Sequence, residues 1–474
     1  MRNEQRAMER TSSYPSDILF RVFPDQGIIV CDGGSADVFN GIFPIWNANV
    51  LSGDRETKKV YWGNMKDKLN ICLVSREYPP ETGWGGIGTY TYHLAHGLSA
   101  LGHQVHVVAQ SLDINKDYRD GDVFVHRIAH RTVFYNKGSL KEFALRLEYS
   151  RRVNGKIQEL IKKYGIDIVE GPNLAGEAFV YNFSRKTALV TRLHTHFSEV
   201  IDFIGWNKTL DLKLSCYLED AVVLRSDLVL CSTRKHAETI SWETGLSSKK
   251  IEIVPLGIPL SDLKNEQRGN GDLKVLFVGR LEKRKGVQVL LKAIPHVLDA
   301  VPEAVFDIVG RDTFVNSDFV SFHGNQKESF KARLIEGLPE KYRAKVRFLG
   351  HVTDQALAEY YRACDVFVAP SLYESFGLIY IEAMGHGKPV IGCGVGGVPE
   401  VVKDGETGLL VPPEDPQRLA CGIIQLLKDP EMRREMGQKA RKHAESCFTR
   451  KLMAERTVAV YRKAIGERKK IRFF

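Results

Sequence analysis

Residues 370–411 read PSLYESFGLIYIEAMGHGKPVIGCGVGGVPEVVKDGETGLLV and place two glutamates, Glu374 and Glu382, beside many glycines. The β-rich run Asp365–Pro370 predicts a strand, and the apolar run Phe376–Gly385 predicts a helix. Glu374 then lies in the loop that joins them. In parallel α/β sheets such loops follow the carboxyl ends of the strands, where ligands bind, so this stretch predicts a ligand-binding edge.

Short β-rich runs and amphipathic helices alternate on both sides of this stretch. Before the polar segment 261–272, which is typical of a linker, strands are predicted at residues 69–75, 104–110, 167–171, 188–194, 227–232 and 251–257. After that segment, strands are predicted at residues 273–279, 304–310, 345–350, 365–370, 389–393 and 407–412. The alternation indicates the α/β class, with two doubly wound, Rossmann-like parallel sheets that face each other across a cleft.

The length and composition indicate how many domains the chain has and which kinds of partner it can bind. A chain of 474 residues is too long for one ordinary core and favours two domains. The net charge of +9 suits a phosphorylated ligand or an anionic membrane surface, but no RNA-binding aromatic signature accompanies the short basic clusters, so no nucleic acid is expected.

Eight cysteines without CxxC spacing predict reduced thiols. Without a membrane-spanning run or a signal peptide, we expect a cytoplasmic protein, with peripheral contact at the inner membrane face left open.

The glycine-rich stretch GWGGIG, residues 83–88, fits the pattern GxGxxG but not a dinucleotide fingerprint. Residues 76–82 separate it from the preceding strand, and the next strand ends at Gln110 rather than at an acidic residue. We expect instead a glycine loop at a helix N-terminus, where Gly85 and Gly86 bring backbone N–H groups to an anion or a sugar. A plain connecting loop is the alternative.

The stretch VGRLEKRKG follows a predicted strand and contributes two cations to the ligand side of the second sheet. Arg280 lies at the end of the strand and Lys285 lies just before a helix. A diphosphate at this edge would accept charge-assisted hydrogen bonds of about 1.5–3 kcal/mol each. The alternative, a solvated surface cation, is more plausible for Arg284 than for Arg280.

The two glutamates are too far apart for a hydrolytic pair. Eight residues of helix span roughly 12 Å, against about 5–9.5 Å between the carboxylates of glycoside hydrolases. Glu374 and Glu382 are therefore expected to hold different parts of one ligand. The N–H groups near Phe376, Gly377 and Leu378 can receive phosphate oxygens, and Glu382 suits a ribose diol. A solvated helix residue is the alternative for Glu382.

Residues 69–470 resemble a retaining glycosyltransferase of family 4 with the GT-B architecture. The matching motifs are Gly85-Gly86, VGRL…KG with Arg280 and Lys285, the pair Glu374 and Glu382 with seven residues between them, and GGVPEVV…GLLV. The resemblance implies an acceptor domain over residues 67–262 and a donor domain over residues 263–449. It also implies that a final helix within residues 450–474 returns to the first domain. Residues 1–66 form an extension to which we assign no chemistry.

The resemblance also implies a role for each matching residue. Arg280 and Lys285 stabilise the diphosphate leaving group, Glu374 faces the donor sugar, and Glu382 takes the ribose hydroxyls. Gly86 lies near the phosphates. His194 touches the sugar close to the reacting carbon.

Two further features bear on the reaction. His196 lies two residues after His194 on a β-like segment, so its side chain is expected to point to the other face. The sequence Asp120-Gly121-Asp122 resembles a metal-binding DxD motif but is interpreted as a turn. Because cations and helix N–H groups can stabilise the charge on a departing diphosphate, no metal and no other cofactor is expected.

The sequence therefore predicts a metal-independent, retaining glycosyltransferase of the hexosyltransferase type. It would move a hexose-type sugar from a nucleoside-diphosphate sugar to a hydroxyl of a sugar or lipid-linked acceptor, as in polysaccharide biosynthesis. The alternatives are a nucleotide-sugar epimerase or sugar phosphorylase on the same architecture, and a nucleotide-sugar-binding protein without catalysis.

Overall fold

The computed structural model describes residues 20–22, 29–31, 67–82, 85–129, 140–204, 206–260, 273–312 and 329–472. The chain divides into two units, Met1–Asn64 and Met65–Phe474. In the first unit, strands β1 (Phe20–Val22) and β2 (Ile29–Cys31) pair in antiparallel fashion. The rest of the extension 1–66 and the linker 261–272 lie outside the described residues.

The second unit contains two sheets. We call residues 67–260 together with helix α15 (Arg450–Arg472) the first lobe, and residues 273–447 the second lobe. No helix in the described part of the chain combines the length and the apolar character that a membrane span requires.

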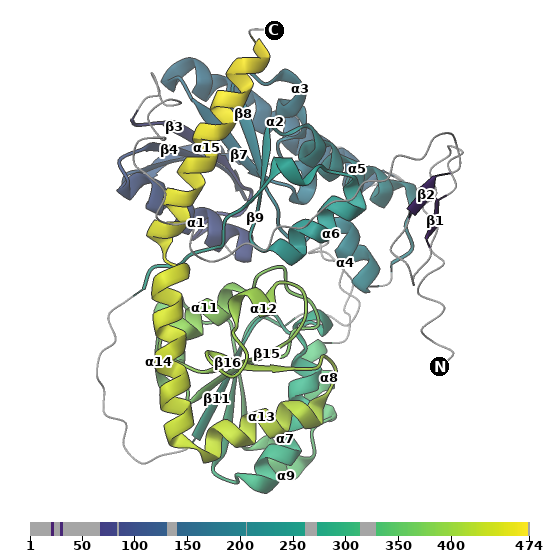
Figure 1. Ribbon diagram of the computed structural model, residues 1–474, viewed down its shortest axis with the longest axis vertical. Coiled ribbons are helices and arrows are strands. Elements are labelled where there is room, and N and C mark those ends of the chain that lie inside the picture. Colours follow the sequence, from purple (N-terminus) through teal and green to yellow (C-terminus); the bar gives the residue numbers. More distant parts are fainter. Residues whose placement is uncertain are drawn as a thin grey trace. The chain divides into compact units, whose positions relative to one another are not determined.

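The sheet of the first lobe has eight strands in the order β10-β9-β8-β7-β3-β4-β6-β5 (Figure 1). These strands are β3 (Asn70–Val74), β4 (Gln104–Ser111), β5 (Lys116–Asp120), β6 (Val123–Ala129), β7 (Ile168–Pro172), β8 (Ala188–Arg192), β9 (Leu228–Cys231) and β10 (Ile251–Ile253). The strand order reverses at β3, because the chain runs from β3 to β4 on one side and returns to β7 on the other. All neighbours are parallel except β5 and β6, an edge hairpin that the sequence did not predict.

Helices connect these strands. They are α1 (Gly86–Ala100), α2 (Lys141–Tyr164), α3 (Phe179–Ser184), α4 (Phe197–Ile204), α5 (Leu210–Arg225) and α6 (Arg234–Thr244), with short 3₁₀ turns at Leu174–Gly176 and Ser248–Lys250. Strands β7, β8 and β9 are buried throughout. Burial on both faces explains the continuous apolar run of β9, whereas β7 and β8 also bury Glu170 and Arg192.

The sheet of the second lobe has six strands in the order β13-β12-β11-β14-β15-β16, all parallel. Its strands are β11 (Leu273–Val278), β12 (Ala304–Val309), β13 (Val346–Gly350), β14 (Val366–Ala369), β15 (Val390–Cys393) and β16 (Gly408–Val411). The order reverses between β11 and β14. The loops that follow these two strands therefore leave the same edge in opposite directions, which is where doubly wound folds bind ligands.

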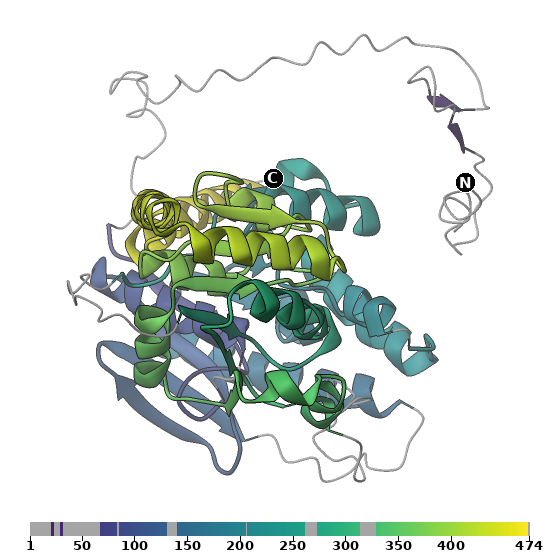
Figure 2. The same cartoon turned by 90° about the horizontal axis from the view of Figure 1, so that it is seen from below.

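The helices of the second lobe cover both sides of this sheet. They are α7 (Val287–Ala300), α8 (Phe330–Glu336), α9 (Glu340–Arg343), α10 (Asp354–Ala363), α11 (Leu378–Gly385), α12 (Val398–Val401), α13 (Pro416–Lys428) and α14 (Pro430–Cys447), with a 3₁₀ turn at Lys283–Lys285. Helices α7 and α13 lie side by side (Figure 1 and Figure 2). The predicted class, two parallel α/β sheets, is confirmed.

The C-terminal helix α15 belongs to the first lobe (Figure 1). Its Tyr461 hydroxyl donates to one oxygen of the buried Glu170 at 2.7 Å, and Tyr90 of α1 donates to the other at 2.6 Å. Ala454 of α15 packs so closely on Gly97 of α1 that a Cβ on Gly97 would lie 3.0 Å from the Ala454 Cβ. The last helix is thus tied to both the sheet and α1 of the first lobe.

Candidate functional site

Two loops of the second lobe pack backbone against backbone at the carboxyl ends of β11 and β14. Gly286 has φ = 71°, and a Cβ at this position would lie 1.8 Å from the Pro370 carbonyl oxygen. The Leu372 N–H donates to the Arg284 carbonyl at 2.8 Å. Only glycine allows both the left-handed backbone and this close approach, so Gly286 fixes the distance between the two loops.

Lys285 and Glu374 form an ion pair between these loops, and the Ser371 hydroxyl donates to the same Glu374 oxygen at 3.2 Å. The Lys285 and Glu374 side chains are only 15% and 9% exposed. Burial alone would raise the pKa of Glu374, but Lys285 and Arg284 hold it below its ordinary value. Burial lowers the pKa of Lys285, and Glu374 opposes that shift. Since an ammonium carries three donors, Lys285 can hold Glu374 and still donate to a ligand.

Arg280 and Arg284 share the carboxylate of Glu282, at 3.3 Å and 2.8 Å from its Oε1. The Arg284 side chain is 15% exposed, and it also donates to the Tyr373 carbonyl at 3.3 Å. The interpretation of Arg284 as a solvated surface cation is therefore wrong, because the side chain braces the loop that carries Glu374. Arg280 is 36% exposed at the end of β11 and remains accessible to a ligand.

The N-terminus of α1 faces this edge, but a side chain already occupies it. Gly85 is the N-cap residue, and the Glu77 carboxylate accepts from the Gly88 N–H at 3.3 Å. Burial raises the pKa of Glu77, while the Gly88 N–H and the charge of Arg280 lower it. Gly86 lies close to the second lobe, since a Cβ there would be 3.9 Å from the Leu378 Cδ1. The sequence reasoning missed Glu77, which competes for the helix N-terminus expected to receive a ligand.

Helix α11 begins at Leu378, two residues later than the sequence predicted. Gly377 is its N-cap with φ = 91°, a left-handed conformation that cannot continue a helix from Phe376. The Phe376 side chain is buried, with its ring 5.7 Å from that of Phe448. The buried ring and the left-handed glycine together define where the N–H groups of α11 begin.

Glu382 lies on α11 and is held by a second-lobe tyrosine. The Tyr361 hydroxyl of α10 donates to the Glu382 Oε2 at 2.7 Å. Burial raises the pKa of Glu382, and the Tyr361 hydrogen bond opposes that shift. Glu382 is therefore a half-buried, hydrogen-bonded carboxylate rather than a solvated helix residue.

His194 follows β8, and its backbone N–H donates to the Asn173 side chain at 2.7 Å. The His194 ring lies edge-on to Tyr90 at 5.5 Å. Burial, with the charge of Arg192, lowers the pKa of His194 to about 3, so this imidazole is neutral at physiological pH.

His196 has a different set of partners and, unlike the neutral His194, is protonated. Its Nδ1 lies 2.7 Å from the Ser198 hydroxyl, and its Nε2 lies 3.2 Å from Asp220. Burial would lower the pKa of His196, but the hydrogen bond to Asp220 and the charge of Glu219 raise it to about 9. His196 is thus a buried imidazolium inside the first lobe.

The loop that carries Glu374 also contacts the first lobe. The Tyr373 hydroxyl donates to Glu199, and the Thr233 hydroxyl donates to the Ser375 carbonyl at 2.8 Å. These two contacts lie on either side of Glu374 in the chain. Sequence reasoning found none of these partners, although Thr233 before a helical run is a recognisable N-cap signal.

The motif Asp120-Gly121-Asp122 closes the β5–β6 hairpin, where Gly121 has φ = 58°. Asp120 accepts a hydrogen bond from the Tyr78 hydroxyl at 2.9 Å and lies 3.1 Å from the His96 Nε2. In the part of the chain that the structure describes, no group of three or more His, Cys, Asp or Glu side chains is arranged to hold a metal ion. The interpretation of this motif as a turn matches its position.

Two family models match consecutive parts of the chain. Residues 84–262 match "Glycosyltransferase Family 4" and residues 261–443 match "Glycosyl transferases group 1". The boundary between the matches falls in the segment between the two sheets. Together the models span residues 84–443, which include His194, Arg280, Lys285, Glu374 and Glu382, whereas Glu77 and helix α15 lie outside them.

Individual proteins show the same relationship. The chain is 27% identical over 414 residues to a glycogen synthase of Mycobacterium tuberculosis (strain ATCC 25618 / H37Rv), which covers 83% of this chain and 94% of the relative. It is 34% identical over 269 residues to a D-inositol 3-phosphate glycosyltransferase of Streptomyces avermitilis, covering 54% of this chain and 56% of the relative. Among solved structures, sucrose-phosphate synthase from Thermosynechococcus elongatus superposes with a TM-score of 0.67 at 25% identity, covering 84% of this chain and 99% of that one.

Proposed function

This chain belongs to glycosyltransferase family 4 and is a glycosyltransferase with the GT-B fold, and we propose that it uses a nucleoside-diphosphate sugar as its donor. It transfers a hexose-type sugar to a hydroxyl acceptor with retention of the anomeric configuration and without an obligatory metal ion or other cofactor. The observation that carries this proposal is the buried Lys285–Glu374 ion pair, set beside Arg280 at the edge where β11 and β14 end.

The proposed chemistry depends on the negative charge that leaves with the nucleoside diphosphate. Arg280 and Lys285 donate to the diphosphate, because one is accessible and the other keeps two donors beyond its bond to Glu374. The N–H groups at the start of α11, from Gly377 and Leu378, add a positive helix end. Preorganised donors of this kind stabilise developing charge without a divalent cation.

Two carboxylates and one neutral imidazole hold the two sugars of the donor. Glu382, oriented by Tyr361, accepts from the ribose hydroxyls, and Glu374 accepts from the hexose. His194 touches the hexose close to the reacting carbon and acts as a neutral hydrogen-bonding group, since its pKa is about 3. Gly86 lets the first lobe approach the phosphates near Leu378.

The acceptor is a hydroxyl of a sugar or of a lipid-linked acceptor, in a pathway of polysaccharide biosynthesis. We place the protein in the cytoplasm, with contact to the inner membrane face. The net charge of +9 favours an anionic surface.

The test is a donor panel of UDP-, GDP- and ADP-glucose with EDTA present. Binding is measured by calorimetry and transfer by the release of nucleotide, with the anomeric configuration of the product read by NMR. We expect one donor to bind and to be turned over in EDTA with retention. Failure of every donor to bind would overturn the proposal.

The same experiment separates the alternatives. A nucleotide-sugar epimerase would convert the donor into its epimer without an acceptor, and a binding protein would hold a donor without turnover on any acceptor. In either case Arg280→Ala should weaken donor binding, whereas Arg418→Ala, an exposed arginine on α13, should not.

A further inference from the structure

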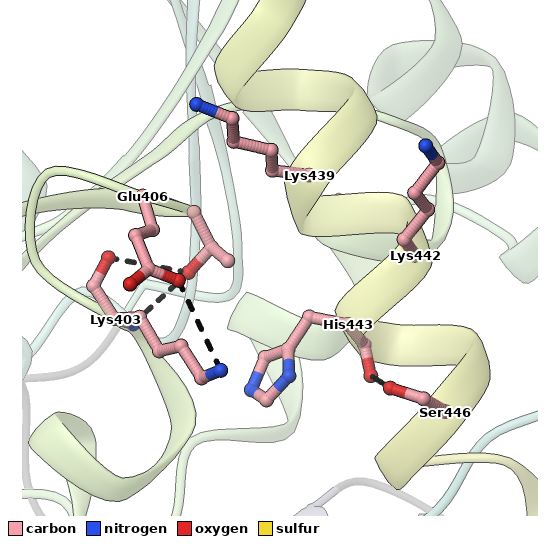
Figure 3. A pocket seen from close by; sticks show the side chains of 7 residues that line it. Lys403, Glu406, Lys439, Lys442, His443 and Ser446 are labelled. Carbon is pink, nitrogen blue, oxygen red and sulfur yellow. Dashed lines mark hydrogen bonds and ion pairs between the residues drawn. The ribbon is translucent and has the colours of Figure 1, made fainter.

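A basic pocket lies in the second lobe, away from the residues assigned to the donor. It occupies about 390 Å³ between helix α14 and the loop that joins α12 to β16. Its lining residues are Lys403, Glu406, Thr407, Lys439, Lys442, His443 and Ser446 (Figure 3). This volume lies at the lower end of the range typical of small-molecule sites, about 300–1,000 Å³.

The pocket carries an excess of positive charge. Lys439 and Lys442 are three residues apart on α14, and neither has an ion-pair partner among the residues that the structure describes. Lys403 Nζ is 3.9 Å from Glu406 Oε2, near the outer limit of an ion pair. Three lysines therefore line the pocket together with one carboxylate, Glu406, which is largely exposed and whose ion-pair partner among the described residues is Lys403.

His443 supplies a polar atom without a partner at the same place. Its Nε2 is buried and makes no hydrogen bond. Burial lowers the pKa of His443, and the charge of Lys403 lowers it further, while the Val401 carbonyl and Glu406 act in the opposite direction. Figure 3 shows the His443 ring turned toward the Lys403 ammonium. The ring thus combines an unsatisfied polar atom with a neighbouring ammonium group.

We propose that this pocket binds a small phosphate-bearing anion. Lys403, Lys439 and Lys442 provide the charge, since lysine acts as a point charge toward phosphate. An anion between them favours the protonated form of His443, so that Nε2 gains a proton to donate and its unmet hydrogen-bonding capacity is satisfied. Glu406 opposes binding and turns toward solvent when the anion enters.

The probes are inorganic phosphate and pyrophosphate, added to the full chain at constant ionic strength. The readout is the His443 ring signal in protein carrying ¹³C-labelled histidine, assigned by its loss in His443→Gln. This signal is local, so binding of either probe at Arg280 and Lys285 does not mimic it. We expect a saturable shift of the His443 signal and a rise in its titration midpoint.

Variants test which side chains bind the anion. The double variant Lys439→Gln/Lys442→Gln should weaken binding at least about tenfold, and Glu406→Gln should strengthen it about threefold. Lys428→Gln, an exposed lysine at the end of α13, is the matched control and should leave binding unchanged. The side chains changed in these variants, Lys439, Lys442, Glu406 and Lys428, are all exposed. The unfolding midpoints of the variants without phosphate should therefore equal that of the wild type, which would verify that each variant is folded.

Two results would overturn the proposal. One is the absence of a saturable His443 shift, or a shift that survives in the double lysine variant. The other is binding to phosphatidylglycerol vesicles, and not to phosphatidylcholine vesicles, without any response to free phosphate or pyrophosphate, which would assign the surface to a membrane instead of a small molecule.

Discussion

The Lys285 ammonium and the Glu374 carboxylate form a buried ion pair that joins the loop after β11 to the loop after β14. Neither residue belongs to a regular strand or α-helix, so the pair depends on the packing of Gly286 against Pro370. The backbone contact brings the two side chains together, and the ion pair in turn orients both groups.

The first prediction concerns the cost of breaking this pair. Glu374→Gln leaves the Lys285 charge buried without a counterion, and loss of one partner of a buried pair costs about 3–5 kcal/mol. We expect the free energy of unfolding to fall by about 3 kcal/mol in urea titrations and sugar transfer to be lost. The control is Glu435→Gln, an exposed residue on α14, which should change stability by less than about 0.5 kcal/mol. Equal stability of the two variants would contradict the prediction.

The second prediction separates two neighbouring arginines. Arg280→Ala should lower kcat/KM for the donor by about a hundredfold, as expected for loss of a donor to a developing negative charge, with little effect on stability. Arg284→Ala should instead destabilise the fold by about 1–3 kcal/mol, since it removes the nearer of the two arginine partners of Glu282 and the donor to the Tyr373 carbonyl. Measuring both quantities for both variants checks the contrast. A stability loss for Arg280→Ala as large as that for Arg284→Ala would argue against it.

Much of this arrangement could be predicted because it depends on local signals. The apolar runs of β11 and β14 and the turn residues after them identify two loops at a sheet edge, and Lys285 and Glu374 lie in those loops. The start of α11 could not be predicted, because the sequence does not show that Gly377 is left-handed. The edge strand β5 was missed for a different reason. Its residues KDYRD are charged and mostly exposed, which is common at a sheet edge but lacks an apolar pattern.

The partners of the site residues were missed because they are distant in sequence. Tyr361 precedes Glu382 by 21 residues, and Glu199 precedes Tyr373 by 174. Such contacts are set by how helices and lobes pack, and no local pattern encodes that packing. The charges of the two histidines likewise follow from packing: burial, with the charge of Arg192, lowers the pKa of His194, and acidic neighbours raise that of His196.

The third prediction concerns the hydrogen bond between Tyr361 and Glu382. Burial raises the pKa of Glu382 and the Tyr361 hydroxyl opposes this, so Tyr361→Phe should raise it further. If the ionised carboxylate holds the ribose, nucleotide affinity falls as the pH falls toward this pKa, and the fall begins at a higher pH in the variant. Calorimetry with the preferred nucleoside diphosphate between pH 5 and pH 8 measures both curves. Superimposable curves would exclude the proposed role of Tyr361.

The fourth prediction is a pH dependence of stability that arises from His196. Its pKa is raised from 6.5 to about 9, so its contribution is fully present below pH 6.5 and is lost as the pH rises toward 9. Since one pKa unit corresponds to about 1.4 kcal/mol, the loss is at most about 3.5 kcal/mol. Urea unfolding of the wild type and of His196→Gln, from pH 6 to pH 9.5, isolates this contribution. The difference in stability between the two proteins should shrink over that interval, and a constant difference would refute the assignment.

The last prediction concerns the contact between the lobes. Both oxygens of Glu400 on α12 accept hydrogen bonds from the first backbone N–H groups of α6, Arg234 at 2.9 Å and Lys235 at 2.8 Å. A carboxylate at a helix N-terminus stabilises the helix through its unpaired N–H groups and its dipole, so Glu400→Ala should cost about 1 kcal/mol. Because α6 and α12 belong to different lobes, the same change should also loosen the lobes, seen as a larger radius of gyration in small-angle scattering. Glu238→Gln, an exposed residue on α6 itself, is the control. A Glu400→Ala variant with the scattering curve of the wild type would show that the remaining contacts, including Thr233 with Ser375, hold the lobes without it.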